Sequence, residues 1–130
     1  MGEYEDTLKD VEKSFGIVPG FMKALPRDVL IHDWPMMKKY TLGESKIPPK
    51  YRELMGLAIA ANIKCPYCIL FHKSAAQLYG ATPVEFAEIA FLASYTSRWS
   101  SMIHAQHYPY EKFERETQQI GEHLSKASKK

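Results

Sequence analysis

The sequence contains only two cysteines in 130 residues. They are Cys65 and Cys68, separated by Pro66 and Tyr67, so the disulfide framework of a small secreted domain is excluded. A chain of this length is typical of one domain and buries roughly two-thirds of its unfolded surface without cross-links. We therefore expect one domain over residues 1–130 in a reducing, cytoplasmic environment.

A charge excess of one sign and a long hydrophobic run are also missing. Seventeen Lys and Arg stand against fifteen Asp and Glu, which does not indicate the basic patch of a nucleic-acid-binding protein. The longest apolar run, Leu54 to Ala61, is far shorter than the roughly 20 residues that span a bilayer. The acidic start, Met1–Asp6, lacks the basic and apolar regions of a signal peptide. The sequence thus predicts no nucleic-acid partner and no membrane partner.

Signals for β-strands are nearly absent. No run of residues alternates clearly between apolar and polar, and no Asn-Gly or Asp-Gly hairpin lies between β-branched segments. Apolar residues recur instead at spacings of three and four, which is one face of a helix. The first such set is Tyr4, Leu8, Val11 and Phe15. The fold class is therefore predicted to be all-α, with about six helices.

The later helices have clear start and stop signals. Proline is tolerated in the first helical turn, so helices are expected over Pro49–Ala61, about Pro66–Tyr79, and from Pro83 to about His107. A mixed-charge helix is expected after Pro109. The segment Pro49–Ala61 is apolar almost all round, which predicts a buried helix. An earlier helix after Pro26 is expected to be kinked or split at Pro35.

The cysteines belong to the segment Cys65-Pro66-Tyr67-Cys68-Ile69-Leu70-Phe71-His72. If Pro66 starts a helix, Cys65 caps it, Cys68 lies in its first turn and His72 lies one turn further. Spacings of three and four place these side chains on one helix face. The partial positive charge at a helix N-terminus stabilises a thiolate, and a neighbouring histidine can accept the thiol proton. This pattern indicates thiol–disulfide exchange or peroxide reduction.

Other interpretations of the cysteine pair are open at this point. Free cysteines often serve as small buried hydrophobic residues. A zinc site needs four ligands, and His104 and His107 could complete one with the cysteines and His72. No second Cys-x-x-Cys supports it, so no metal is predicted. The tetrapeptide Cys-Pro-Tyr-Cys also matches the glutaredoxin active site, but that family is mixed α/β and is rejected here.

A wider set of residues is more specific than the tetrapeptide. It comprises Tyr51-Arg52-Glu53-Leu54, Ala60-Ala61-Asn62, the Cys65-x-x-Cys68-x-x-x-His72 segment and Gly80-Ala81-Thr82. This pattern resembles the AhpD-like alkylhydroperoxidase family, which belongs to the carboxymuconolactone decarboxylase superfamily. The motif core covers about residues 48–88, and a weaker likeness that includes Phe15–Pro19 reaches back to about Val11.

The resemblance implies a helical subunit that assembles as a trimer or hexamer and needs no cofactor. It assigns the redox site to Cys65, Cys68, His72 and Glu53. Cys68 would attack a hydroperoxide or disulfide, Cys65 would resolve the product, and Glu53 and His72 would relay protons. A thiol or dithiol protein would supply the electrons. The capping position favours Cys65 as the more thiolate-like sulfur, but we follow the resemblance and assign the first attack to Cys68.

Alternative functions remain. One is a non-enzymatic helical oligomer whose cysteines bind zinc or sense oxidation. Another is a decarboxylase-like enzyme acting on a small carboxylated ring, although that branch of the superfamily lacks the cysteine pair. The best-known alkylhydroperoxidases also carry a second histidine where this chain has Tyr67, which leaves the reductant and the peroxidase efficiency open.

An aromatic and basic cluster lies on the predicted long helix. It comprises Tyr95, Arg98, Trp99, His104 and His107. We expect it to form core and subunit interface, with substrate contact as the alternative.

Overall fold

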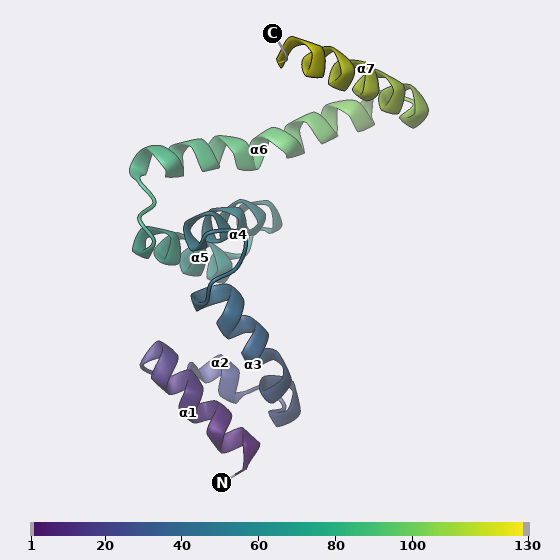
Figure 1. Ribbon diagram of the computed structural model, residues 1–130. Helices are drawn as coiled ribbons and strands as arrows, with labels where there is room; N and C mark the ends of the chain where they lie inside the picture. The colour runs from purple at the N-terminus through teal and green to yellow at the C-terminus, as the bar shows by residue number, and fades with distance from the viewer. Residues whose placement is uncertain (1, 129–130) are drawn as a thin grey trace.

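The computed structural model describes residues 2–128, and within that range it contains seven α-helices and no strand (Figure 1). The helices are α1 (Glu3–Phe15), α2 (Gly20–Lys23), α3 (Arg27–Leu42), α4 (Pro49–Ile63), α5 (Pro66–Leu78), α6 (Pro83–Ala105) and α7 (Tyr110–Ser128). The all-α prediction is confirmed, with one helix more than the expected number of about six. No described helix is long and apolar enough to cross a membrane.

Helix starts follow the sequence signals closely. The α6 helix begins with a complete capping box, in which the Thr82 hydroxyl accepts from the Glu85 amide at 3.2 Å and the Glu85 carboxylate accepts from the Thr82 amide at 3.0 Å. These bonds satisfy two amides that the helix itself leaves unpaired. The α4 helix ends at Lys64, which is left-handed at φ 59°. It therefore runs two residues beyond Ala61, where the sequence predicted its end.

Pro35 lies inside α3 but does not split it, since the helix is continuous from Arg27 to Leu42. The neighbouring Trp34 is only 3% exposed and packs edge-on against Phe15. Its indole Nε1 donates to the Asp10 carboxylate at 2.8 Å. Packing of this turn against α1 stabilises the helix on both sides of the proline, because tertiary contacts supply most helical stability.

The first three helices form one packed group around Val11, Met22, Leu30 and Trp34, which are almost fully buried. Asp10 joins α1 to α3, since Lys38 Nζ lies 2.9 Å from its carboxylate in addition to the Trp34 bond. Hydrogen bonds from Lys38 and then from Trp34 hold the pKa of Asp10 below its usual value. These bonds form best with the ionised carboxylate, so this contact between α1 and α3 weakens as pH falls through that lowered pKa.

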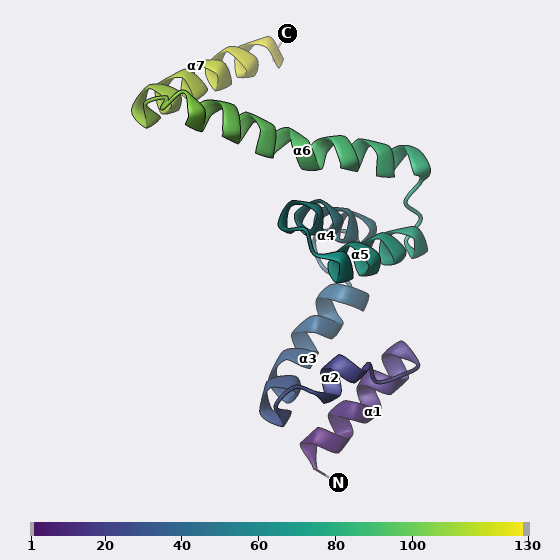
Figure 2. The same ribbon diagram turned by 180° about the vertical axis from the view of Figure 1, so that it is seen from behind.

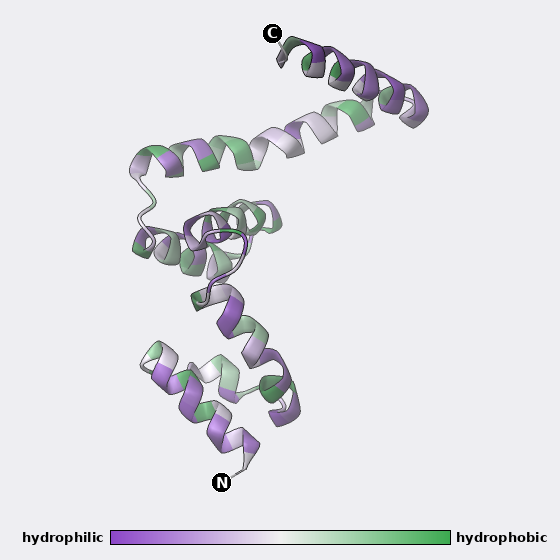
Figure 3. Cartoon of the chain, viewed as in Figure 1, coloured by the Kyte–Doolittle hydropathy of each residue, from purple (hydrophilic) through white to green (hydrophobic). Residues whose placement is uncertain are grey.

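The central helices α4 and α5 form an antiparallel hairpin, and α6 crosses above α4 (Figures 1 and 2). Leu54 and Ala60 of α4 are buried, but Met55 and Ile59 are 48% and 62% exposed. The prediction of a fully buried helix is therefore wrong for the single chain: one face of α4 is covered and another is open. The α7 helix folds back over the end of α6, is mostly hydrophilic (Figure 3), and contributes no buried residue.

Candidate redox site

The site is built where α4 ends and α5 begins. Lys64 turns the chain in a left-handed conformation, Cys65 follows with an extended backbone, and Pro66 is the first residue of α5. Cys65 is the N-cap, and its sulfur accepts from the Cys68 amide at 3.2 Å. The predicted capping position is confirmed. The sulfur of Cys65 thus occupies the place where a helix N-terminus stabilises negative charge.

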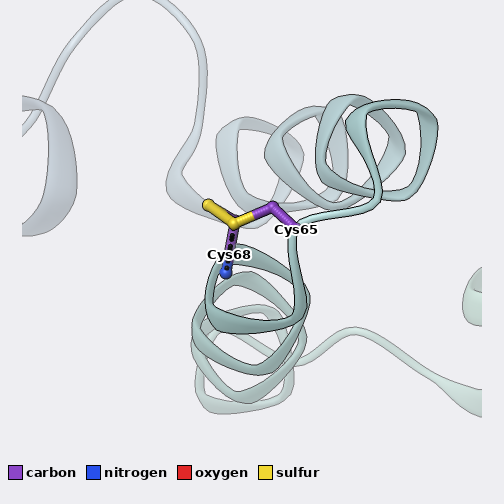
Figure 4. The surroundings of a disulfide bond; sticks show 2 residues. All are labelled: Cys65 and Cys68. Carbon is purple, nitrogen blue, oxygen red and sulfur yellow. Dashed lines mark hydrogen bonds between the residues drawn. A yellow bond between two sulfur atoms is a disulfide. The ribbon is translucent and has the colours of Figure 1, made fainter.

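Cys65 and Cys68 form a disulfide in the structure, with their Cα atoms 5.4 Å apart (Figure 4). This separation lies within the range that a disulfide spans without backbone movement. Both cysteines are half-buried, while Tyr67 between them is 85% exposed. The structure therefore places the sulfur pair within reach of the surface at the start of α5.

Glu53 and His72 form a pair across the α4–α5 hairpin. His72 Nδ1 lies 2.7 Å from Glu53 Oε2, and Glu53 is only 3% exposed. An ionised carboxylate only accepts hydrogen bonds, so the contact fixes the proton on Nδ1 and makes Nε2 the basic nitrogen of a neutral ring. A buried carboxylate is costly without a partner, and His72 supplies one. The structure brings together these two site residues, which are 19 positions apart in the sequence.

Arg52, next to Glu53, and Asn62, three residues before Cys65, connect α4 to its neighbours. The Arg52 guanidinium donates to the Gly43 carbonyl at 2.8 Å and to the Ser45 hydroxyl at 2.9 Å, which fixes the α3–α4 loop. The Asn62 amide donates to the Ala93 carbonyl of α6 at 2.9 Å. Both residues belong to the motif segments of the sequence, but nothing local identifies these distant partners.

The histidines on α6 and after it are not part of this constellation. His104 Nδ1 lies 2.8 Å from the Ser100 carbonyl in its own helix, and His107 follows the helix with φ 49°. Across residues 2–128, no group of three or more metal-ligating side chains could hold an ion. Tyr95 and Trp99 instead form part of a ladder of aromatic rings, with centroids 6.2 Å apart and both side chains about half exposed.

Fold and site together define an all-helical protein with a cysteine pair at a helix N-terminus and a buried glutamate bonded to a partly buried histidine. Residues 30–109 match the carboxymuconolactone decarboxylase family, and the chain belongs to that family. Its structure is similar to the crystal structure of the alkylhydroperoxidase AhpD core from Rhodospirillum rubrum, with a TM-score of 0.72 and 26% identity over 85% of each chain. No curated protein matches the sequence. The predicted AhpD-like fold is thereby confirmed.

Proposed function

We propose that this protein is a thiol-dependent peroxidase that cycles Cys65 and Cys68 between dithiol and disulfide. The observation that carries the proposal is the buried Glu53 carboxylate bonded to His72, whose ring lies one helical turn beyond Cys68. A carboxylate that orients an imidazole beside a thiol is the arrangement that activates a cysteine nucleophile. A protein that merely buried two thiols would not need it.

The reaction begins with the dithiol. Nε2 of His72 takes the Cys68 proton, and the thiolate attacks the outer oxygen of a hydroperoxide. The O–O bond breaks, an S–O bond forms, and the leaving alkoxide takes the proton from the imidazolium. Cys68 sulfur is oxidised by two electrons to a sulfenic acid. Cys65 sulfur then attacks Cys68 sulfur, the S–S bond forms, and water leaves.

The resulting disulfide is reduced by two electrons and two protons from a thiol or dithiol protein. The same attack by Cys68 on a disulfide in place of a peroxide would make the protein a disulfide reductase, with a mixed disulfide as the intermediate. A cytoplasmic location agrees with both cycles, because cytosolic thiols are kept reduced.

The family and the fold are consistent with alkylhydroperoxidase-like or decarboxylase-like chemistry. The cysteine pair favours the first of these, since decarboxylation of a small carboxylated ring does not require two thiols that close into a disulfide. We therefore propose the redox activity and not the decarboxylase activity for this protein.

The direct test mixes reduced protein with one equivalent of tert-butyl hydroperoxide. We expect two thiols to be lost per peroxide consumed, tert-butanol to appear, and peptide mapping to find the Cys65–Cys68 bond. Metal analysis of the same reduced sample should find no stoichiometric zinc. Free cysteines after the reaction, or disulfides only between chains, would contradict the proposal. One zinc per chain would contradict it too and would favour the zinc-binding alternative.

We also propose that the chain assembles with copies of itself. Its accessible surface is 10181 Å², whereas a compact folded protein of 14.9 kDa exposes about 7,000 Å². The excess of roughly 3,000 Å² is several times the roughly 800 Å² that each partner buries in a standard interface. The exposed large apolar side chains of α6 and α7 are Val84, Phe91, Leu92, Tyr95, Trp99, Tyr110, Phe113, Ile120 and Leu124.

Assembly makes a prediction about mass. Light scattering behind size exclusion should give three or six times 14.9 kDa at micromolar concentration. Replacing Phe91 and Trp99 by Glu should lower this mass, because charged residues are costly at the core of an interface, whereas Phe21→Glu on α2 serves as an exposed control. A monomeric parent protein would contradict the assembly.

A further inference from the structure

Gly56 lies in the middle of α4, where its backbone gives no reason for glycine. The left-handed glycines of the described chain are Gly16 and Gly80, at φ 83° and 89°, and Gly56 is not among them. In a helix interior, glycine is less favourable than alanine, because it loses more conformational freedom on folding. A reason for glycine at this position must therefore come from what lies beside it.

The neighbour is the imidazole of His72. A Cβ built on Gly56 would lie 2.5 Å from both Nδ1 and Cε1 of that ring, and 2.8 Å from its Cγ. Nδ1 is the atom that bonds Glu53 at 2.7 Å. The ring edge that meets the carboxylate therefore occupies the volume that any larger side chain at position 56 would fill.

The carboxylate partner of that ring cannot easily follow it if it moves. Glu53 is 3% exposed and lies one turn before Gly56 on the same face of α4. Phe71, which is 44% exposed, also meets the ring in an edge-on contact with ring centroids 5.5 Å apart. Because real Cβ atoms essentially never show contacts shorter than 3.0 Å, even alanine at position 56 requires the ring or its surroundings to shift.

We propose that Gly56 is a positioning residue, whose missing side chain forms the slot in which His72 meets Glu53. Without that slot, the ring loses the bond that keeps its proton on Nδ1. The proton can then also lie on Nε2, which is no base in that tautomer. The consequence for catalysis rests on the proposed function, in which Nε2 takes the thiol proton. The positioning itself does not depend on it.

The test compares Gly56→Ala with Gly121→Ala. Gly121 also lies inside a helix, and nothing lies within 4 Å of a Cβ built there. Nitrogen-15 NMR of the labelled histidines, with His72 assigned through His72→Gln, reports which ring nitrogen carries the proton. We measure it on the oxidised protein, in which neither cysteine can exchange a proton, at a pH where the ring is neutral.

We expect one Nδ1-protonated form of His72 in the parent and in Gly121→Ala, and a mixture of both tautomers in Gly56→Ala, with equal helix content by circular dichroism in all three. An unchanged His72 spectrum in Gly56→Ala would overturn the proposal. So would loss of helix content in that variant alone, because it would show a role in folding instead of ring placement.

Kinetics then separate this proposal from the proposed function. In the reduced protein, Gly56→Ala should slow the reaction of Cys68 with peroxide by about 10- to 100-fold, less than the roughly 10²–10⁴-fold of general-base help, because the ring is displaced but not removed. It should cause no further loss when added to His72→Ala, because the ring that it displaces is gone. An additive loss in the double variant would overturn the positioning role. A shifted tautomer with an unchanged rate would support positioning and contradict the proposed use of His72 as a base.

Discussion

Cys68→Ser is expected to abolish peroxide reduction, with a loss of at least about 10³-fold in the rate of tert-butyl hydroperoxide consumption. The serine hydroxyl is not ionised at neutral pH and cannot be oxidised by two electrons, so neither the attack nor the S–O intermediate forms. The serine keeps the size of the side chain in the first turn of α5, and circular dichroism should show unchanged helix content.

Cys65→Ser is the matched control, because it removes a sulfur three residues away in the same cap. It should retain one fast reaction per chain and stop at the sulfenic acid of Cys68, which dimedone labels and mass spectrometry detects. A retained reaction in Cys68→Ser together with its loss in Cys65→Ser would reverse the order of attack. That order would agree with the capping position of Cys65, whose sulfur accepts from the Cys68 amide.

The local part of the site could be predicted from the sequence because it depends on one helix. Once Pro66 begins α5, the spacing of three from Cys65 to Cys68 and of four from Cys68 to His72 places these three side chains on one face. The capping of Cys65 follows from the same start. These features need no knowledge of how the helices pack.

The contact between Glu53 and His72 could not be derived in this way. It requires α4 and α5 to fold back on each other in one register, and a glutamate near the start of a helix is ordinarily solvated. Only the family resemblance singled out Glu53. Gly56 was missed altogether, because its function lies in space that it leaves open.

The burial of α4 shows a different limit. Its all-round apolar pattern predicts burial, yet Ile59 and Met55 are exposed in the single chain. The pattern in the sequence reflects every surface that is covered in the working molecule, whereas one chain covers only the surfaces that it can reach itself. The exposed face of α4 and the apolar side chains of α6 therefore both support the proposed assembly.

His72→Ala and Glu53→Gln are expected to slow the reaction of Cys68 with peroxide by about 10²–10⁴-fold, the usual value of general-base help. His72→Ala removes the group that takes the thiol proton. Glu53→Gln keeps the size of the side chain but removes the carboxylate, whose Oε2 lies 2.7 Å from Nδ1 of His72. Both variants should also move the rise in iodoacetamide alkylation to higher pH, since both remove help in forming the thiolate.

The two losses should not add, because groups that act as one relay fail together. The double variant should therefore react about as slowly as His72→Ala alone. His32→Ala and Glu12→Gln are matched controls on exposed positions of α3 and α1, and their profiles should equal that of the parent. The parent, the two single variants of Glu53 and His72 and the double variant could instead give the same alkylation profile. In that case the relay would not exist, and the contact between Glu53 and His72 would serve only to pair a buried carboxylate.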